Sequence, residues 1–147
     1  MRKELILFSI LAAAALPAGA TLGGTAESVV TDQSKLHAKR AVVDRQNYAV
    51  HEITSDDGTL IREYVTPAGK VFGVSWNGPT IPDLTQLLGP YNAEFQTAMR
   101  AKRGRRSSAA VHNSDLVVES SGHMRAFRGR AYLNSMLPSG VTEEVVQ

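Results

Sequence analysis

The sequence predicts a protein of the α+β class, in which a broken helix packs on one face of an antiparallel sheet. Three short β-rich runs separated by tight turns lie within residues 47–77 and predict a three-strand meander. Apolar residues then recur at three- and four-residue steps over residues 84–99, which indicates an amphipathic helix. Two further β-rich runs, at residues 116–119 and 123–133, predict a C-terminal hairpin, with a turn at residues 120–122 between them.

The meander is defined by its turns. Ser-Asp-Asp-Gly at residues 55–58 and Pro-Ala-Gly-Lys at residues 67–70 are typical turn sequences, because Asp tolerates the bend and Gly supplies a positive φ. The second and third runs each show one more apolar face, as expected for a sheet that is buried on one side. Gly73, inside the third run, predicts a bulge or a close backbone contact. The three strands are expected at residues 48–53, 60–66 and 71–76.

The helix has a recognisable start and an expected break. Thr80 and Asp83 form a looser relative of the capping box, and Pro82 fits the first turn of a helix. Gly89-Pro90 interrupts the apolar pattern, and a proline inside a helix costs about 3 kcal/mol, so we expect a break there. The apolar stripe stays in phase across the break, so both pieces can lie on the same face of the sheet.

Three other segments carry weaker signals. Residues 26–43 contain neither Gly nor Pro and predict a helix, with a strand over residues 39–43 as the alternative. Residues 100–110 are basic, small and rich in serine, which indicates a solvated helix end followed by a loop. Residues 141–147 are expected to form one helical turn.

The N-terminus has the layout of a secretory signal peptide. Arg2 and Lys3 precede an apolar run over residues 5–16, and Pro-Ala-Gly-Ala at residues 17–20 supplies an A-x-A cleavage site. The run is shorter than the roughly 20 residues that a membrane-spanning helix needs. We therefore expect a signal peptide at residues 1–20, with an uncleaved anchor as the alternative. Cleavage would export the protein to the periplasm or the medium, with no membrane span left.

The composition of residues 21–147 predicts a single α+β domain. These 127 residues are enough to bury a core, and the chain contains no cysteine, so stability must come from packing rather than disulfides. Removing residues 1–20 lowers the formal net charge from +2 to +1. Such a near-balanced, exported chain is a poor partner for nucleic acid.

The chain lacks the motifs that usually indicate enzymatic chemistry. None of its four histidines lies in an H-E-x-x-H motif, and Asp56-Asp57-Gly58 fits a hairpin turn rather than a calcium loop. No G-x-S-x-G elbow and no glycine-rich phosphate loop is present. We therefore expect no metal, no cofactor and no enzymatic activity. A hydrolase with an unrecognised site, dependent on His51 and His123, is the less favoured alternative.

Two regions supply candidate binding residues. Residues 123–133 combine arginine with aromatic side chains, as recognition surfaces often do, although an edge strand also uses charge to block unwanted pairing. Trp76, at a strand end, can line a cleft between sheet and helix or plug the end of the core. The basic run at residues 100–106 can contact anionic head groups or form a solvated loop. The candidate residues are Trp76, Asn77, His123, Arg125, Phe127, Arg128, Arg130 and Tyr132.

Three separated segments resemble one protein family. They are LGGT after the predicted signal, REYVTPAGKVFGVSWNGPTIPDLTQLLG in the middle, and SGHMRAFRGRAYLNSMLPSGV near the end. Together they resemble the bacterial family called domain of unknown function 2844, which consists of short exported proteins. The resemblance implies export and a single domain, and it brings no reaction, ligand or functional residue with it.

These observations lead to an ordered set of functional expectations. The first is an exported, non-enzymatic binding or accessory protein whose partner is another protein of the cell envelope. The second is a carrier or sensor that holds a small ligand in a sheet–helix cleft near Trp76. The hydrolase comes third.

Overall fold

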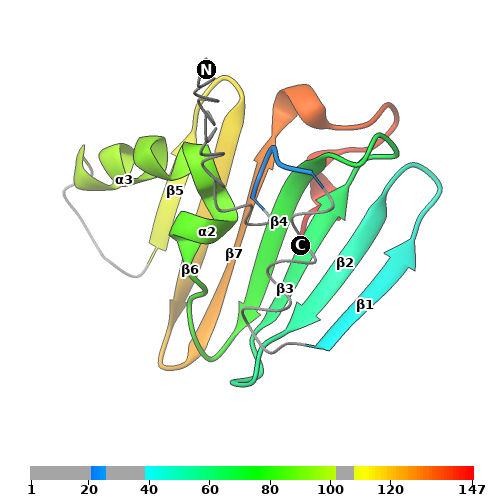
Figure 1. The fold of residues 1–147 in the computed structure, drawn as a ribbon. Coiled ribbons are helices and arrows are strands. Elements are labelled where there is room, and N and C mark those ends of the chain that lie inside the picture. Colours follow the sequence, from blue (N-terminus) through cyan, green and yellow to red (C-terminus); the bar gives the residue numbers. More distant parts are fainter. Residues whose placement is uncertain (1–20, 26–38, 102–107) are drawn as a thin grey trace, which may run out of the picture.

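The computed structural model describes residues 21–25, 39–101 and 108–147, and the predicted signal peptide therefore lies outside the described residues. One antiparallel sheet of seven strands dominates the structure, in the spatial order β1-β2-β3-β4-β7-β6-β5 (Figure 1). With the helices described below, this architecture confirms the α+β class. The strands are β1 (Lys39–Asp44), β2 (Ala49–Thr54), β3 (Leu60–Val65), β4 (Val71–Gly78), β5 (Ser108–His112), β6 (Leu116–His123) and β7 (Ala126–Leu133).

The order of the strands reflects one long crossover. Strands β1 to β4 follow one another as in the sequence, and the chain then crosses to the far edge of the sheet, where β5 begins. It returns through β6 and β7, and β7 pairs with β4 in the middle of the sheet. The first four strands and the last three therefore meet at the β4–β7 pair.

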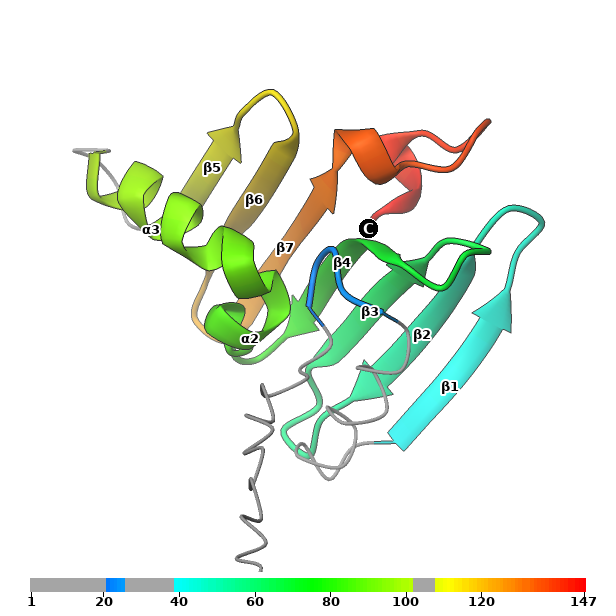
Figure 2. The ribbon, with the colours of Figure 1, turned by 45° about the horizontal axis from the view of Figure 1, so that its top comes forward.

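A broken helix covers part of one face of the sheet (Figure 2). It consists of α2 (Leu84–Leu88), the 3-10 turn η1 (Gly89–Tyr91) and α3 (Asn92–Ala101). The Asp83 carboxylate caps the first turn by accepting a hydrogen bond from the Thr85 amide at 2.9 Å. Leu87, Leu88 and Phe95 point into the main core against the sheet. No helix in the described part of the chain is both long and apolar enough to cross a membrane.

The predictions missed two strands, both at the edges of the sheet. Residues 39–43 belong to β1, so the helical prediction was wrong there and its strand alternative was right. The rest of that prediction, residues 26–38, lies outside the described residues, as does most of the basic run. Ser108–His112 form β5, although residues 108–110 were predicted as loop. Both edge strands are specified by pairing with β2 and β6, a tertiary effect that local patterns do not reveal.

The hairpin of β6 and β7 turns later than predicted. The turn was expected at residues 120–122, but β6 continues to His123, and Met124 and Arg125 form the turn with positive φ values of 49° and 67°. Gly122 lies in the strand, where an added Cβ would come within 2.3 Å of the Ala126 carbonyl oxygen. This glycine therefore permits close approach of the two strands rather than a bend.

The C-terminal strap, which we define as residues 134–147, packs against the other face of the sheet. It contains two 3-10 turns, η2 (Asn134–Met136) and η3 (Glu143–Val145), so the predicted single turn at residues 141–147 corresponds to η3. Val146 is fully buried in a second apolar cluster that the strap forms with the sheet. The register between β3 and β4 shifts at Tyr64/Val65, and the bulge predicted from Gly73 is thus confirmed beside that glycine.

Candidate functional site

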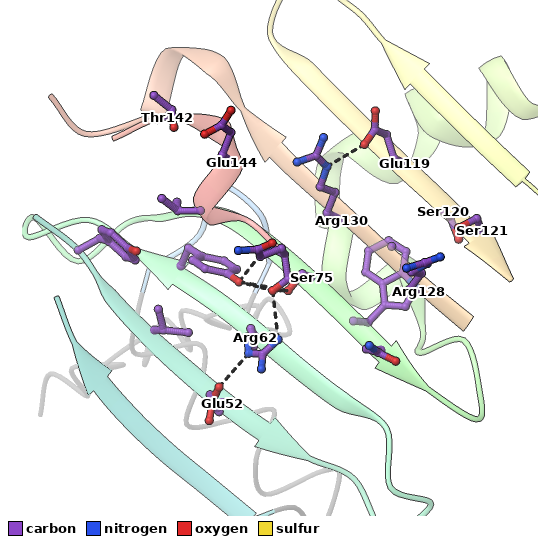
Figure 3. Close-up of a pocket in the computed structure, with 18 of the residues that line it drawn as sticks. Glu52, Arg62, Ser75, Glu119, Ser120, Ser121, Arg128, Arg130, Thr142 and Glu144 are labelled. Atoms are coloured by element: carbon purple, nitrogen blue, oxygen red, sulfur yellow. Dashed lines mark hydrogen bonds and ion pairs between the residues drawn. The ribbon is translucent and has the colours of Figure 1, made fainter. Parts of the chain in front are cut away.

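The sheet face that is not covered by the helices carries a groove of about 1140 Å³ (Figure 3). Its floor is the sheet itself, and residues of all seven described strands line it. The C-terminal strap supplies one wall. Because side chains alternate between the two faces of a strand, every second side chain of a strand points to this floor. The groove is therefore built from residues that are far apart in the sequence.

A continuous row of polar residues crosses the floor. Glu52 on β2 lies opposite Arg62 on β3, and Arg62 lies opposite Ser75 on β4. Ser75 in turn lies opposite Arg130 on β7, and Arg130 lies opposite Glu119 on β6. Directly opposed residues share one face of a sheet, so these five residues form one line across five strands. We call this line the polar row.

The two arginines of the polar row are each paired with a glutamate. Arg62 Nε lies 2.8 Å from Glu52 Oε1, and Arg130 Nε lies 2.7 Å from Glu119 Oε2. The hydrogen bond from Arg130 lowers the pKa of Glu119 below its ordinary value, although burial acts in the opposite direction. Arg130 also lies over the ring of Tyr132, with Cζ 5.6 Å from the ring centroid. These pairs hold both guanidinium groups in place and balance their charge.

A second row, next to the polar row, is more open. Asn77 on β4 lies opposite Arg128 on β7, which lies opposite Ser121 on β6. The side chains of Asn77, Arg128 and Ser121 are all exposed. Within the described part of the chain, Arg128 has no ion-pair partner, in contrast to Arg62 and Arg130. Its guanidinium is therefore a charge at the groove that the described residues do not balance.

The centre of the groove holds a well-defined oxygen site. The main-chain oxygen of Gln147 accepts hydrogen bonds from Tyr64 Oη at 2.7 Å, from Ser75 Oγ at 3.1 Å and from Arg62 Nη1 at 3.1 Å (Figure 3). Tyr64 and Ser75 are only 2% and 3% exposed. The Tyr64 hydroxyl also accepts a hydrogen bond from the Gln147 amide at 3.1 Å. The strap thus places the main chain of Gln147 over the polar row.

The structure brings together only some of the residues that the sequence suggested. Arg128, Arg130 and Asn77 line the groove, and Tyr132 lies on the same face in the second apolar cluster. Two factors explain why: β7 lies in the middle of the sheet, and its even-numbered residues face the groove. Because β7 is a central strand, its arginines are not there to protect an edge.

The remaining candidates lie elsewhere. Trp76 is among the lining residues, but its side chain is 2% exposed and packs in the helix-covered core. An added Cβ on Gly129 would come within 2.1 Å of the Trp76 ring, so this glycine makes room for the indole. Phe127 alternates with Arg128 and faces the same side as Trp76. His123 and Arg125 are exposed at the β6–β7 turn, away from the groove.

Several groove residues were not among the candidates. The most important are Arg62, Tyr64 and Ser75, which build the oxygen site, and Glu52 and Glu119, which pair with the arginines. Arg62 and Tyr64 do alternate on the more polar side of their strand, which is a signal in the sequence. Nothing local indicates that Ser75 lies beside Arg130 or that the strap reaches Ser75, because both contacts join distant segments.

Within the described part of the chain, neither His51 nor His123 forms a hydrogen bond with the buried Ser75, and His112 pairs with Glu119 at 3.1 Å. His51 is buried on the helix-covered face, where Arg40 Nη2 lies 3.0 Å from its Nδ1, whereas His123 is at the β6–β7 turn. Ser75 Oγ contacts Tyr64 and Gln147. No group of three or more potential metal ligands occurs among the residues that the structure describes.

Comparison with known proteins gives one match, at the level of a family. Neither the curated proteins nor the solved structures contain a match to this chain. A family model described as "Protein of unknown function (DUF2844)" matches residues 18–146, which include every described strand, the broken helix and nearly all of the strap. The chain therefore belongs to this family, as the three sequence segments suggested.

Proposed function

We propose that this chain is an exported, non-enzymatic binding protein of the cell envelope, and that its partner binds in the groove. The predicted signal peptide at residues 1–20 supports export, and the single domain that follows it supports an accessory role. A concave site lined by a few convergent polar groups is the usual location of ligand binding. The central serine bonds to Tyr64 and Gln147 rather than to a base, which supports a binding role over catalysis.

The observation that carries this proposal is the state of Arg128. Arg62 and Arg130 are balanced by Glu52 and Glu119, but Arg128 is exposed and has no ion-pair partner within the described part of the chain. A guanidinium presents a planar fork of donors that fits a carboxylate or phosphate group. Asn77 and Ser121, its neighbours across the strands, add uncharged hydrogen-bonding groups. We therefore expect the partner to place an acidic side chain at Arg128.

A charge reversal at Arg128 tests the binding site. The bait proteins are the wild-type chain, an Arg128→Glu variant and a matched Arg125→Glu variant, whose altered residue is exposed but lies outside the groove. We expect wild type and Arg125→Glu to capture the same protein from an envelope extract, and Arg128→Glu to lose it. A labelled hexaglutamate peptide should bind Arg128→Glu at least about tenfold more weakly, because an opposite charge now meets it.

Two results would overturn the proposal. Capture and hexaglutamate binding that are equal for Arg128→Glu and Arg125→Glu would remove the groove as the binding site. A soluble cytosolic protein that retains residues 1–20 would remove export, whereas cleavage should leave residue 21 as the N-terminus in the periplasm or medium. Mass spectrometry of the protein from each cell fraction shows whether residues 1–20 are still present.

A second candidate is a carrier for a small ligand near Trp76. Among the described residues, the buried Trp76 Nε1 has no hydrogen-bond partner. Buried donors are nearly always satisfied, so an acceptor atom of a ligand would complete this site. Native mass spectrometry of protein purified from its host should then show additional mass, and a spectrum of the bare chain would exclude this candidate.

A further inference from the structure

We infer that the centre of the groove is a peptide-binding subsite, and that the chain's own Val146-Gln147 segment occupies it in this structure. The natural occupant from a partner would be a peptide segment with an aliphatic residue, bound in exchange for the strap. This inference rests on the proposed binding function and names the chemistry of the partner. It has two parts, an apolar hole and the oxygen site.

The apolar hole is shaped for one aliphatic side chain. Val146 is fully buried and packs in a cluster with the aromatic rings of Tyr64, Phe72 and Tyr132. An added Cβ on Gly73 would lie 2.9 Å from Val146 Cγ2, so the absence of a side chain at this position creates part of the hole. The register shift beside Gly73 leaves Phe72 without a partner in the β3–β4 register, and Phe72 packs in the same cluster as Val146. A branched side chain of this size therefore fits, and a charged one would be buried at a high cost.

The oxygen site recognises the peptide backbone rather than a side chain. Three donors converge on the Gln147 main-chain oxygen, and the same Tyr64 hydroxyl accepts from the Gln147 amide. Gln147 thus has both its main-chain oxygen and its amide bonded to side chains of the sheet. The Gln147 residue itself is exposed, so its side-chain identity matters little. Such a site accepts any peptide that places an aliphatic residue in the hole one position earlier.

The strap is attached in a way that allows exchange. No strand of the described sheet pairs with it, so its departure breaks no β-ladder. The amides of Val145 and Val146 bond to carbonyls within the strap, at 3.2 and 3.1 Å. Further along, Asn47 Nδ2 donates to the Ser139 carbonyl at 3.2 Å. Arg130 Nη1 also donates to the Glu143 carbonyl at 3.4 Å, and the amides of Asn134 and Ser135 donate to Asp115. A competing peptide must therefore replace the contacts of Val146 and Gln147, whereas the start of the strap can stay in place.

Competition with a free peptide tests the subsite. The probe is a labelled peptide with the sequence of residues 141–147, acetylated at its N-terminus and with a free carboxylate at its C-terminus, added to the full chain and followed by fluorescence anisotropy. Val146→Ala in the protein weakens the internal competitor but leaves the hole intact, so the peptide should bind about tenfold more tightly, equivalent to about 1.4 kcal/mol. Asn47→Ala loosens the strap outside the subsite and should give a smaller gain of about threefold. A peptide with Asp in place of the residue that corresponds to Val146 should not bind.

The outcomes separate this inference from the proposed function. If Val146→Ala is folded by circular dichroism and binds the peptide no better than wild type, or binds the Asp peptide equally well, the subsite is wrong. If Val146→Ala does not fold, the Asn47→Ala variant is used instead. The subsite is then wrong if Asn47→Ala binds the peptide no better than wild type. Capture of an envelope protein that depends on Arg128 but without any peptide effect would retain the binding function and reject only the peptide subsite.

Discussion

The two faces of the sheet are made by the same strands and differ in almost every property. On the helix-covered face, Val74, Val118 and Ala131 are fully buried and form the main core with the broken helix. On the groove face, the residues next to them in sequence include Ser75, Glu119 and Arg130, which form the polar row. Alternation along a strand lets one segment serve both purposes. The comparison teaches that one face serves mainly for packing, whereas the other combines a smaller apolar cluster with polar groups that face the groove.

The groove face is itself divided. Its apolar part lies under the strap, where Val146 joins the second cluster. Its polar part ends at Asn77 and Arg128, which are exposed. A ligand that enters the open part would meet the strap at Gln147, over the polar row. Substitutions on the helix-covered face should therefore mainly change stability, whereas substitutions in the open part of the groove should mainly change binding.

The largest expected effect comes from filling the space under Trp76. In Gly129→Ala, the new methyl group would lie 2.1 Å from the indole ring and 2.7 Å from the Glu119 carbonyl oxygen, so ring or backbone must move. Overpacking of this kind should lower the free energy of unfolding by about 3 kcal/mol. Urea denaturation can be followed by the fluorescence of Trp76, the single tryptophan of the chain. A loss below about 1 kcal/mol would show that this face is not tightly packed.

An intermediate effect is expected from pH, through a buried histidine on the helix-covered face. Burial, and secondarily the charge of Arg40, lower the pKa of His51 below its ordinary value, and Asp44 opposes them. The unfolded chain therefore binds a proton at His51 near pH 6.5 while the folded chain does not, so stability falls as pH falls from 7.5 to 5.5. One such group contributes at most about 1.4 kcal/mol per pH unit.

A His51→Gln variant isolates this contribution. Urea unfolding at pH 7.5 and pH 5.5 should show a smaller decrease in stability for the variant than for wild type. The two proteins are otherwise identical, so every other pH-dependent contribution cancels in the difference. An equal decrease in both proteins would mean that His51 has the same pKa in the folded and unfolded chain.

The smallest effect on stability is expected on the open groove face. Arg128→Ala, one position before Gly129, removes an exposed side chain with no ion-pair partner in the described residues and should change the free energy of unfolding by no more than about 0.5 kcal/mol. Binding of hexaglutamate should nevertheless weaken. A large loss of stability in this variant would show that the groove face, like the other, is mainly structural.

Local sequence patterns predicted the central strands and the broken helix because these depend on alternation, turn residues and proline chemistry. They did not predict β1 and β5, since short edge strands such as Ser108–His112 are specified by their neighbours. The turn between β6 and β7 was misplaced because Ser-Ser-Gly is a better turn sequence than Met124-Arg125. There, the pairing along the two strands outweighs local preference.

By itself the sequence determined the α+β class, the family and the arginine-rich strand that contains Arg128 and Arg130. Only the tertiary structure decided that β7 lies in the middle of the sheet, that Ser75 joins Arg62 to Arg130, and that the strap fills the oxygen site. The physical reason is range. Turns and helix stripes are encoded by residues a few positions apart, whereas the groove depends on contacts between segments more than 50 positions apart in the chain.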